Sequence, residues 1–181
     1  MNCRTRLRNA TAALHRQVDA AFSAFRLEQA DDYRRFLRAH ARVIPALEQA
    51  LGASAATAHL PDWPQRCRSN ALLADLAELD EAPPPAPFVA LGDDEGAFWG
   101  AAYVLEGSRL GAQLLLQRVR QGAAERPQRY LGHAAGETLW PRFLQRLEAR
   151  ASYCDEAALQ AAAGAVFSRF AAAARLERSL R

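Results

Sequence analysis

Apolar residues recur every three or four positions along almost the whole chain, and this helical period constrains the fold more than any other feature. In residues 4–25 the resulting stripe consists of Leu7, Ala10, Leu14, Val18, Ala21 and Phe22. No segment alternates with the two-residue period of a β-strand for long enough to predict a sheet. Alanine, leucine, arginine and glutamate dominate, whereas valine, isoleucine and threonine are scarce, which is a helix-forming composition. The sequence therefore predicts an all-α fold.

Length and spacing predict one domain of six or seven helices over residues 1–181. A chain of 181 residues can bury one sizeable core but is too short for two ordinary domains. The expected helices cover residues 4–25, 29–51, 69–80, 96–120, 138–151 and 155–180. Asp31 is expected to cap the second helix, and Pro45 should kink it or mark a joint. Consecutive prolines predict an extended connection over residues 81–96.

The charge pattern excludes some classes of partner. The net charge is +3, every one of the 23 basic residues is arginine, and these arginines are spread along the chain. Because no basic arm is concentrated anywhere, we expect no nucleic-acid partner. The three cysteines are far apart, which is typical of free thiols in a reducing compartment. There is no apolar N-terminal signal, and the uncharged runs fall short of the roughly 20 residues of a membrane span, so we expect a cytoplasmic location.

Two glycines interrupt the expected helix 96–120 where it should be strongest. Gly107 and Gly111 lie four residues apart on one face, and each costs about 1 kcal/mol relative to alanine. Such a pair allows either tight packing against another helix or the close approach of a ligand to the backbone. The small neighbours Ser108 and Ala112 are compatible with a flat ligand lying across this surface.

A histidine in the first helix has the sequence context of a metal ligand. Asp19 follows His15 by one helical turn, so the two side chains share a face. The carboxylate can accept a hydrogen bond from one imidazole nitrogen, which leaves the other free to bind a metal. An exposed histidine beside an exposed aspartate would have the same spacing. No other histidine has ligand spacing to a partner.

Arginines at helical spacing could bind ligand carboxylates through bidentate contacts. Arg8 precedes His15 by about two turns, and Arg142 and Arg146 lie one turn apart; any of them could equally lie on a solvated face. Taken together, the histidine, the glycine-bearing helix and the arginines would sandwich a flat, dianionic metal macrocycle. This arrangement is typical of a heme with one axial imidazole and one open position.

Two segments resemble a known family. "LRNATAALHRQVD" is similar to the first-helix motif of heme oxygenases, and "YVLEGSRLGAQLL" to the distal-helix motif of their bacterial branch. "RYLGHAAGETLWPRFLQRLEA" and "AVFSRFAAAARL" resemble the closing helices more loosely, and the order is the same over nearly the whole chain. The similarity is greatest to small soluble bacterial members that make biliverdin, including those found beside bacteriophytochromes. It implies oxygen- and reductant-dependent cleavage of heme, as substrate and cofactor, to biliverdin, CO and iron.

The resemblance also implies roles for residues on both faces of the heme. His15 takes the place of the proximal iron ligand, and Asp19 that of its acidic support. Gly107 and Gly111 match the distal glycines whose backbone lies against the porphyrin. Ser108 stands where animal members have an aspartate that organises distal water.

The resemblance further implies contacts at the edge of the heme. Arg8 falls where the family places a basic residue near a propionate, and Tyr103 matches a tyrosine at the pocket edge. Arg142 and Arg146 lie near a second basic propionate contact. The implied partners are heme, an electron donor of the ferredoxin or flavoprotein reductase type, and a bacteriophytochrome as an acceptor of biliverdin. A heme carrier or sensor without turnover, and a helical interaction module without heme, remain as alternatives.

Overall fold

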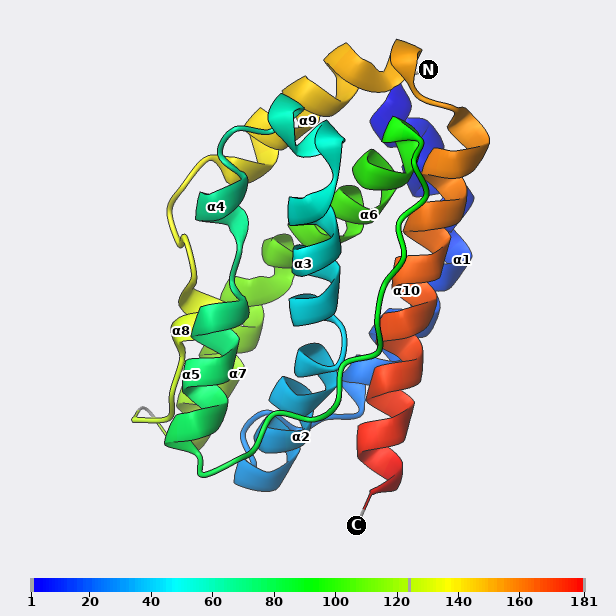
Figure 1. Cartoon of the computed structure of the whole chain (residues 1–181). Coiled ribbons are helices and arrows are strands. Elements are labelled where there is room, and N and C mark those ends of the chain that lie inside the picture. Colours follow the sequence, from blue (N-terminus) through cyan, green and yellow to red (C-terminus); the bar gives the residue numbers. More distant parts are fainter. Residues whose placement is uncertain (1, 124, 181) are drawn as a thin grey trace.

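The computed structural model describes residues 2–123 and 125–180, and within these ranges it contains helices and no strand. The all-α prediction is therefore confirmed. Residues 1, 124 and 181, which belong to the predicted single domain, lie outside the described residues. The α-helices are α1 (Cys3–Ser23), α2 (Ala30–Ala41), α3 (Ile44–Ala53), α4 (Trp63–Arg66), α5 (Ser69–Glu78), α6 (Glu95–Gly107), α7 (Ala112–Gly122), α8 (Arg129–Gly132), α9 (Leu139–Arg150) and α10 (Glu156–Ser179) (Figure 1). Short 3₁₀ helices are η1 (Ala55–His59), η2 (Ser108–Gly111) and η3 (Ala151–Tyr153).

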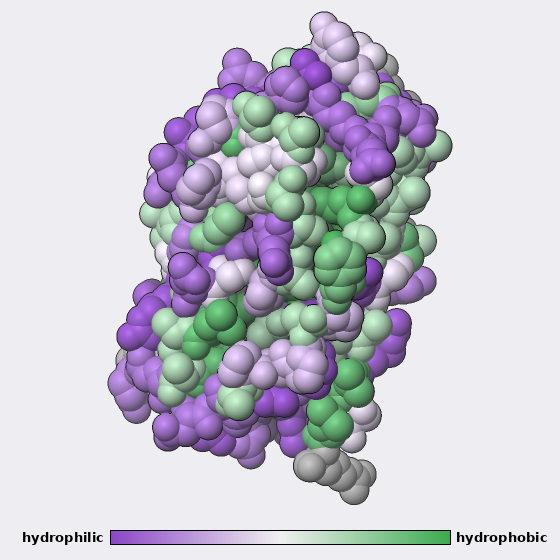
Figure 2. Space-filling model, in the orientation of Figure 1, coloured by the Kyte–Doolittle hydropathy of each residue, from purple (hydrophilic) through white to green (hydrophobic). Residues whose placement is uncertain are grey.

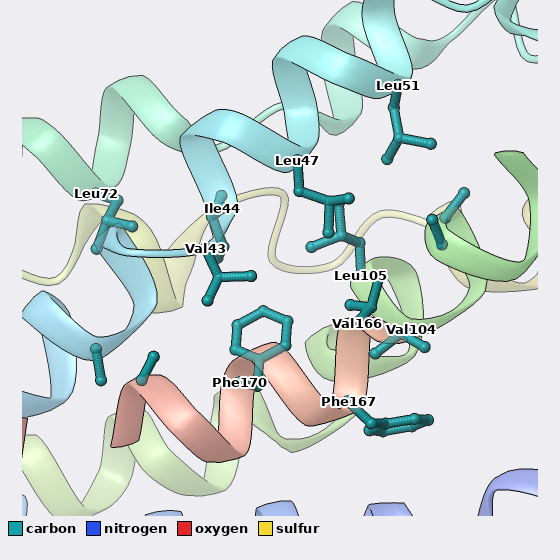
Figure 3. Packing of buried hydrophobic residues seen from close by; sticks show 14 of the residues in the cluster. Val43, Ile44, Leu47, Leu51, Leu72, Val104, Leu105, Val166, Phe167 and Phe170 are labelled. Carbon is teal, nitrogen blue, oxygen red and sulfur yellow. The ribbon is translucent and has the colours of Figure 1, made fainter. Parts of the chain in front are cut away.

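Helix α10 makes the most extensive helix contacts in the described residues, because α6, α1 and α2 all pack along it. In Figure 1 it runs down one side of the bundle with α1 beside it. The core forms where α10, α3 and α6 meet, as Figure 3 shows for Phe170 of α10, Leu47 of α3 and Leu105 of α6. These side chains are almost fully buried, so the apolar stripes of the sequence form one continuous core.

The apolar character of α10 has an explanation within this packing. By length and composition alone the helix could cross a membrane, but 44% of its most apolar window is buried inside the protein. Its N-terminus is capped by Asp155, whose carboxylate accepts hydrogen bonds from the backbone amides of Ala157 and Ala158. A core helix contacted along its length by three others requires such an apolar surface.

The predicted second helix is divided at the expected joint. Helix α2 ends before Val43, and α3 begins with Pro45 in its first turn, where a proline needs no amide hydrogen. The prediction of Asp31 as the N-cap is wrong. Helix α2 starts earlier, since the amide of Tyr33 already donates to the carbonyl of Gln29 at 3.0 Å, which places Asp31 within the first turn.

The connection from α5 to α6 is extended, as its prolines predict. It crosses the face formed by α3 and α10, where Figure 1 shows it as a long coil without secondary structure. Figure 2 shows apolar side chains on this face, and the side chain of Phe88, a residue of the connection, is exposed. Between α3 and α5 the chain forms η1 and the single turn α4.

Two glycines of α6 serve packing alone. A Cβ atom on Gly100 would lie 2.0 Å from the carbonyl oxygen of Leu159, and one on Gly96 would lie 2.7 Å from that of Asp155. Helices α6 and α10 therefore approach at a distance that only glycine allows. This close contact fixes where the later part of α6, which carries Gly107, leaves the core.

Candidate functional site

The glycine-bearing segment is kinked at the position of its glycines. The expected single helix 96–120 is divided into α6, η2 and α7, with η2 spanning Ser108–Gly111. A 3₁₀ stretch inside a longer helix tightens the turn and changes the helix direction. The chain therefore bends at the glycine pair, and the α-helix is not continuous through it.

The surroundings of the two glycines favour a ligand over a packed helix. A Cβ atom on Gly111 would have no heavy atom within 4 Å, and one on Gly107 would reach only the Trp140 ring, at 3.7 Å. The neighbouring side chains of Leu110 and Leu114 are 61% and 66% exposed. An apolar surface of this kind without a covering side chain is typical of a binding face.

His15 and Asp19 form the contact that their spacing predicts. The Nδ1 atom of His15 lies 2.8 Å from Oδ2 of Asp19, and the two side chains are 60% and 64% exposed. Because Nδ1 is bound to the carboxylate, Nε2 is the nitrogen left to bind a metal. The imidazole ring packs edge-on against Phe167 at a centroid distance of 5.6 Å. His15 is thus oriented by two neighbours and still accessible.

Helix α10 packs against both α1 and α6, the two helices that lead to the predicted site residues. Phe167 supports His15 of α1, and in Figure 3 its ring points away from the other labelled side chains of the core. Helix α6 packs on α10 through the close contact at Gly100. Helix α1 and the kinked segment are consequently held by the same helix, and each presents an exposed surface that the core does not use.

One end of the site gathers polar groups around Trp140. The ring of Tyr103 lies 5.7 Å from that of Trp140, and the Arg4 guanidinium lies 6.0 Å from the same ring. Burial raises the pKa of the Tyr103 hydroxyl, an effect opposed by the positive charges of Arg4 and Arg8. The charges of Arg4 and Arg8 therefore both act on Tyr103, and Arg4, which contacts Trp140, is a residue that the sequence patterns did not indicate.

Arg142 and Arg146 lie elsewhere. Arg142 approaches Asp62 and Glu137, each at 3.8 Å, and Nη1 of Arg146 lies 3.5 Å from the carbonyl oxygen of His59. On α9 these arginines are two and six residues beyond Trp140, which places them on the opposite side of the helix. The structure does not bring them to His15 or Tyr103.

A buried ion network lies behind the kink. Glu106, at the end of α6, pairs with Arg66 and with Nε of Arg109, the latter at 3.0 Å, and the side chains of Glu106 and Arg66 are 1% and 0% exposed. Arg66 also donates to Asp62 at 2.7 Å. Arg109 Nη1 lies 3.1 Å from Nδ1 of His133. Charges are found at such depth when they are paired, so this network fixes the segment that follows Glu106.

Ser108 is positioned by hydrogen bonds to two groups next to this network. Its hydroxyl donates to the carbonyl of Leu105 at 2.6 Å and accepts a hydrogen bond from Nη2 of Arg68. Its remaining lone pair is open to water, because Ser108 itself is exposed. In the sequence, this network is indicated only by Glu106, a charged residue within an apolar helix. Its partner Arg66 lies too far away in sequence to be identified from the local pattern.

The donor groups agree with a macrocycle that brings its own metal. Among the described residues no group of three or more His, Cys, Asp or Glu side chains could hold a metal ion. The cysteines are free, and burial raises the pKa of the Cys67 thiol to about 11, so it is no ready nucleophile. One oriented imidazole, an open apolar glycine face and arginines at one edge fit a heme, which needs a single axial ligand and contacts for two carboxylates.

Comparisons with known proteins agree with this fit. No family model matches the chain. A heme oxygenase of Xanthomonas campestris pv. campestris (strain 8004) is 34% identical over 153 residues, which make up 78% of this chain and 87% of that protein. The crystal structure of the NO- and CO-bound heme oxygenase from Neisseria meningitidis has the same fold, with a TM-score of 0.82, 22% identity, and coverage of 100% of this chain and 94% of that one. Because this chain is similar to the Xanthomonas protein over most of both chains, it belongs to the heme oxygenase family.

Proposed function

We propose that this heme-degrading enzyme binds its substrate between α1 and the kinked segment, with His15 as the axial ligand of the iron. The observation that carries the proposal is the geometry of His15, whose Nδ1 is bound to Asp19 at 2.8 Å. The carboxylate fixes the tautomer, so Nε2 presents its lone pair to the metal. Phe167 limits rotation of the ring from the side of α10.

The opposite face of the heme would lie against Gly107 and Gly111. Because a Cβ on Gly111 would meet nothing within 4 Å, this backbone can approach a flat ring without displacing a side chain. Leu110 and Leu114 would cover the porphyrin beside it and exclude water. The backbone at the two glycines would limit the space beside the ring and so restrict which edge of the ring can react.

The heme carboxylates would lie near Arg8 and Tyr103. The charges of Arg4 and Arg8 both act on the Tyr103 hydroxyl, so these three residues would supply the donors at this end of the site. Tyr103 stays protonated near neutral pH, since burial raises its pKa, and it can donate a hydrogen bond. Arg142 and Arg146 are not part of this proposal.

Bound heme supplies the redox-active iron with which oxygen and electrons react, and the protein residues control position and protons. Asp19 holds His15, and the glycine backbone restricts access to the ring. The hydroxyl of Ser108 accepts from Arg68 and keeps one lone pair for an ordered water, which can move protons to the open face. We propose biliverdin, CO and iron as the products.

The partners and the location follow from the same proposal. The net charge of +3 suits transient docking of an acidic electron donor of the ferredoxin or flavoprotein reductase type. We propose a cytoplasmic protein whose biliverdin can be passed to a bacteriophytochrome. The apolar helix α10 does not conflict with this location, because α6, α1 and α2 pack along it and 44% of its most apolar window is buried inside the protein.

The test is a titration of the purified protein with hemin, followed by a reductant in air with catalase present. A Soret band typical of histidine ligation that decays into broad biliverdin absorption is the expected result. His15→Ala should abolish turnover and leave the helical circular dichroism unchanged, because the side chain is 60% exposed. The matched control is His59→Ala, an exposed histidine on η1.

Two outcomes would contradict the proposal. A stable Soret band without product would indicate a carrier or sensor in place of an oxygenase. Wild-type turnover by His15→Ala would show that another group holds the iron.

A further inference from the structure

The kink leaves backbone groups at the end of α6 that need partners. Where an α-helix passes into a 3₁₀ turn, some carbonyls lose their usual amide donors. The carbonyl of Leu105 is one of these, and it accepts from the Ser108 hydroxyl at 2.6 Å and from Nη2 of Arg68 at 3.2 Å. Arg68 is the residue immediately before α5, so this hydrogen bond to the Leu105 carbonyl is a tertiary contact and not part of helix α6.

Arg68 is a buried cation without an ion-pair partner among the described residues. It is 4% exposed, and none of the carboxylates in the described part of the chain lies within ion-pairing distance of its guanidinium. Both hydrogen bonds of the guanidinium to described residues come from Nη2 and go to Leu105 and Ser108. The guanidinium lies 5.0 Å from the centroid of the Tyr130 ring.

The position of Arg68 is itself fixed. Its backbone amide donates to Oε1 of Glu48 at 2.9 Å, and the amide of Ser69 donates to the other carboxylate oxygen at 3.0 Å. Glu48 on α3 therefore caps the start of α5 and anchors the residue that reaches the kink. Arg68 also lines a cavity of about 140 Å³ together with Arg109, Tyr130 and His133. Its Nε and Nη1 groups can donate to water there.

We propose that Arg68 is a positioning residue for heme oxidation, because it caps the C-terminal end of α6 and holds the η2 turn in the shape that presents Gly107 and Gly111. A cation at a helix C-terminus complements the partial negative charge of the last carbonyls. A buried charge that is not neutralised by a carboxylate is costly, and its retention here is explained by the two groups it clamps. This inference rests on the proposed placement of heme against the two glycines.

The first test uses the heme-free protein. Hydrogen exchange of the amides of residues 107–112 should accelerate about tenfold in Arg68→Met and less in Arg68→Lys, because loss of the clamp removes hydrogen bonds worth roughly one power of ten. The matched control is Arg42→Met. Arg42 is a largely buried arginine between α2 and α10, and its partner Glu177 would still be paired with Arg38 in the variant. It should leave exchange in residues 107–112 unchanged.

The second test uses the hemin-loaded enzyme and separates positioning from mere stability. A loosened kink should change the proportions of the biliverdin isomers and lower kcat more than it raises KM, whereas Arg42→Met should change neither. Ser108→Ala removes one of the two clamped groups from an exposed position, so it tests the clamp even where Arg68→Met does not fold.

The outcomes separate this inference from the proposed function. Unchanged exchange in both Arg68→Met and Ser108→Ala, or equal acceleration in Arg42→Met, would overturn the clamp. Faster exchange with an unchanged isomer pattern and unchanged kcat would limit Arg68 to stability and overturn the positioning role. Failure of the wild type to degrade heme would overturn the proposed function, while the exchange experiment would still decide the clamp.

Discussion

At the scale of single residues, this protein uses arginine for tasks that require several directed donors. Arg66 donates to Glu106, Asp62 and the carbonyl of Leu139, so one planar side chain joins three elements. A lysine could not reproduce this, because its ammonium lacks the fixed fork of donors. The absence of lysine from the sequence is therefore compatible with the structure, and at Arg66 and Arg68 the guanidinium is structurally required.

One partly buried histidine should make stability depend on pH. His40 lies among four aromatic rings, and burial lowers its pKa to about 3, with a further contribution from the charge of Arg68, while a hydrogen bond to the carbonyl of Phe36 opposes the shift. In the unfolded chain the pKa is about 6.5, so the unfolded state binds a proton first as pH falls. The contribution of neutral His40 to the stability of the folded state is thus complete above about pH 6.5 and is lost toward lower pH.

The measurement is urea unfolding of the wild type and His40→Gln between pH 7 and pH 5. Below pH 6.5 the wild type should lose up to about 1.4 kcal/mol per pH unit more than the variant. Burial and Arg109 also lower the pKa of His133, but this histidine is present in both proteins and cancels from the difference. Parallel pH profiles for the two proteins would show that His40 is not the source.

At the scale of elements, the glycines of the α6–η2–α7 segment divide into two kinds with opposite predictions. Gly100→Ala should lower the free energy of unfolding by about 1–3 kcal/mol, because its Cβ would lie 2.0 Å from the carbonyl oxygen of Leu159. Gly111→Leu should leave stability within about 0.5 kcal/mol, since its Cβ meets no atom within 4 Å, but it should block hemin binding. Chemical unfolding and a hemin titration measure both effects. Normal hemin binding by Gly111→Leu would remove this face from the site.

The elements that sequence patterns predict are those whose signals are local. The stripes of α1, α9 and α10 predict these helices to within about two residues at each end, because a period of 3.6 residues specifies a buried face directly. The glycine pair likewise indicates the bend at η2. The network behind the bend was missed, because Arg66 and Glu106 are 40 residues apart and nothing in either local pattern identifies the other.

At the scale of the whole molecule, one helix makes the two halves of the site interdependent. Helix α10 supports His15 through Phe167 and holds α6 through the contact at Gly100, so binding between α1 and the kinked segment should stabilise the entire fold. Hemin at one hundred times its Kd should raise the free energy of unfolding by about 2.7 kcal/mol if it binds only the native state. Thermal unfolding over a range of hemin concentrations measures this increase.

Iron-free protoporphyrin separates the two parts of this stabilisation. It offers the same flat, dianionic ring but no metal, so it can use the glycine face and the arginine edge without His15. In His15→Ala the stabilisation by hemin should therefore fall to about that by protoporphyrin, which should itself be unchanged, whereas Gly111→Leu should lose both. Equal stabilisation of the wild type and His15→Ala by hemin would place the iron ligand elsewhere. Stabilisation of Gly111→Leu by either ring would mean that α1 and the kinked segment are not the two walls of one site.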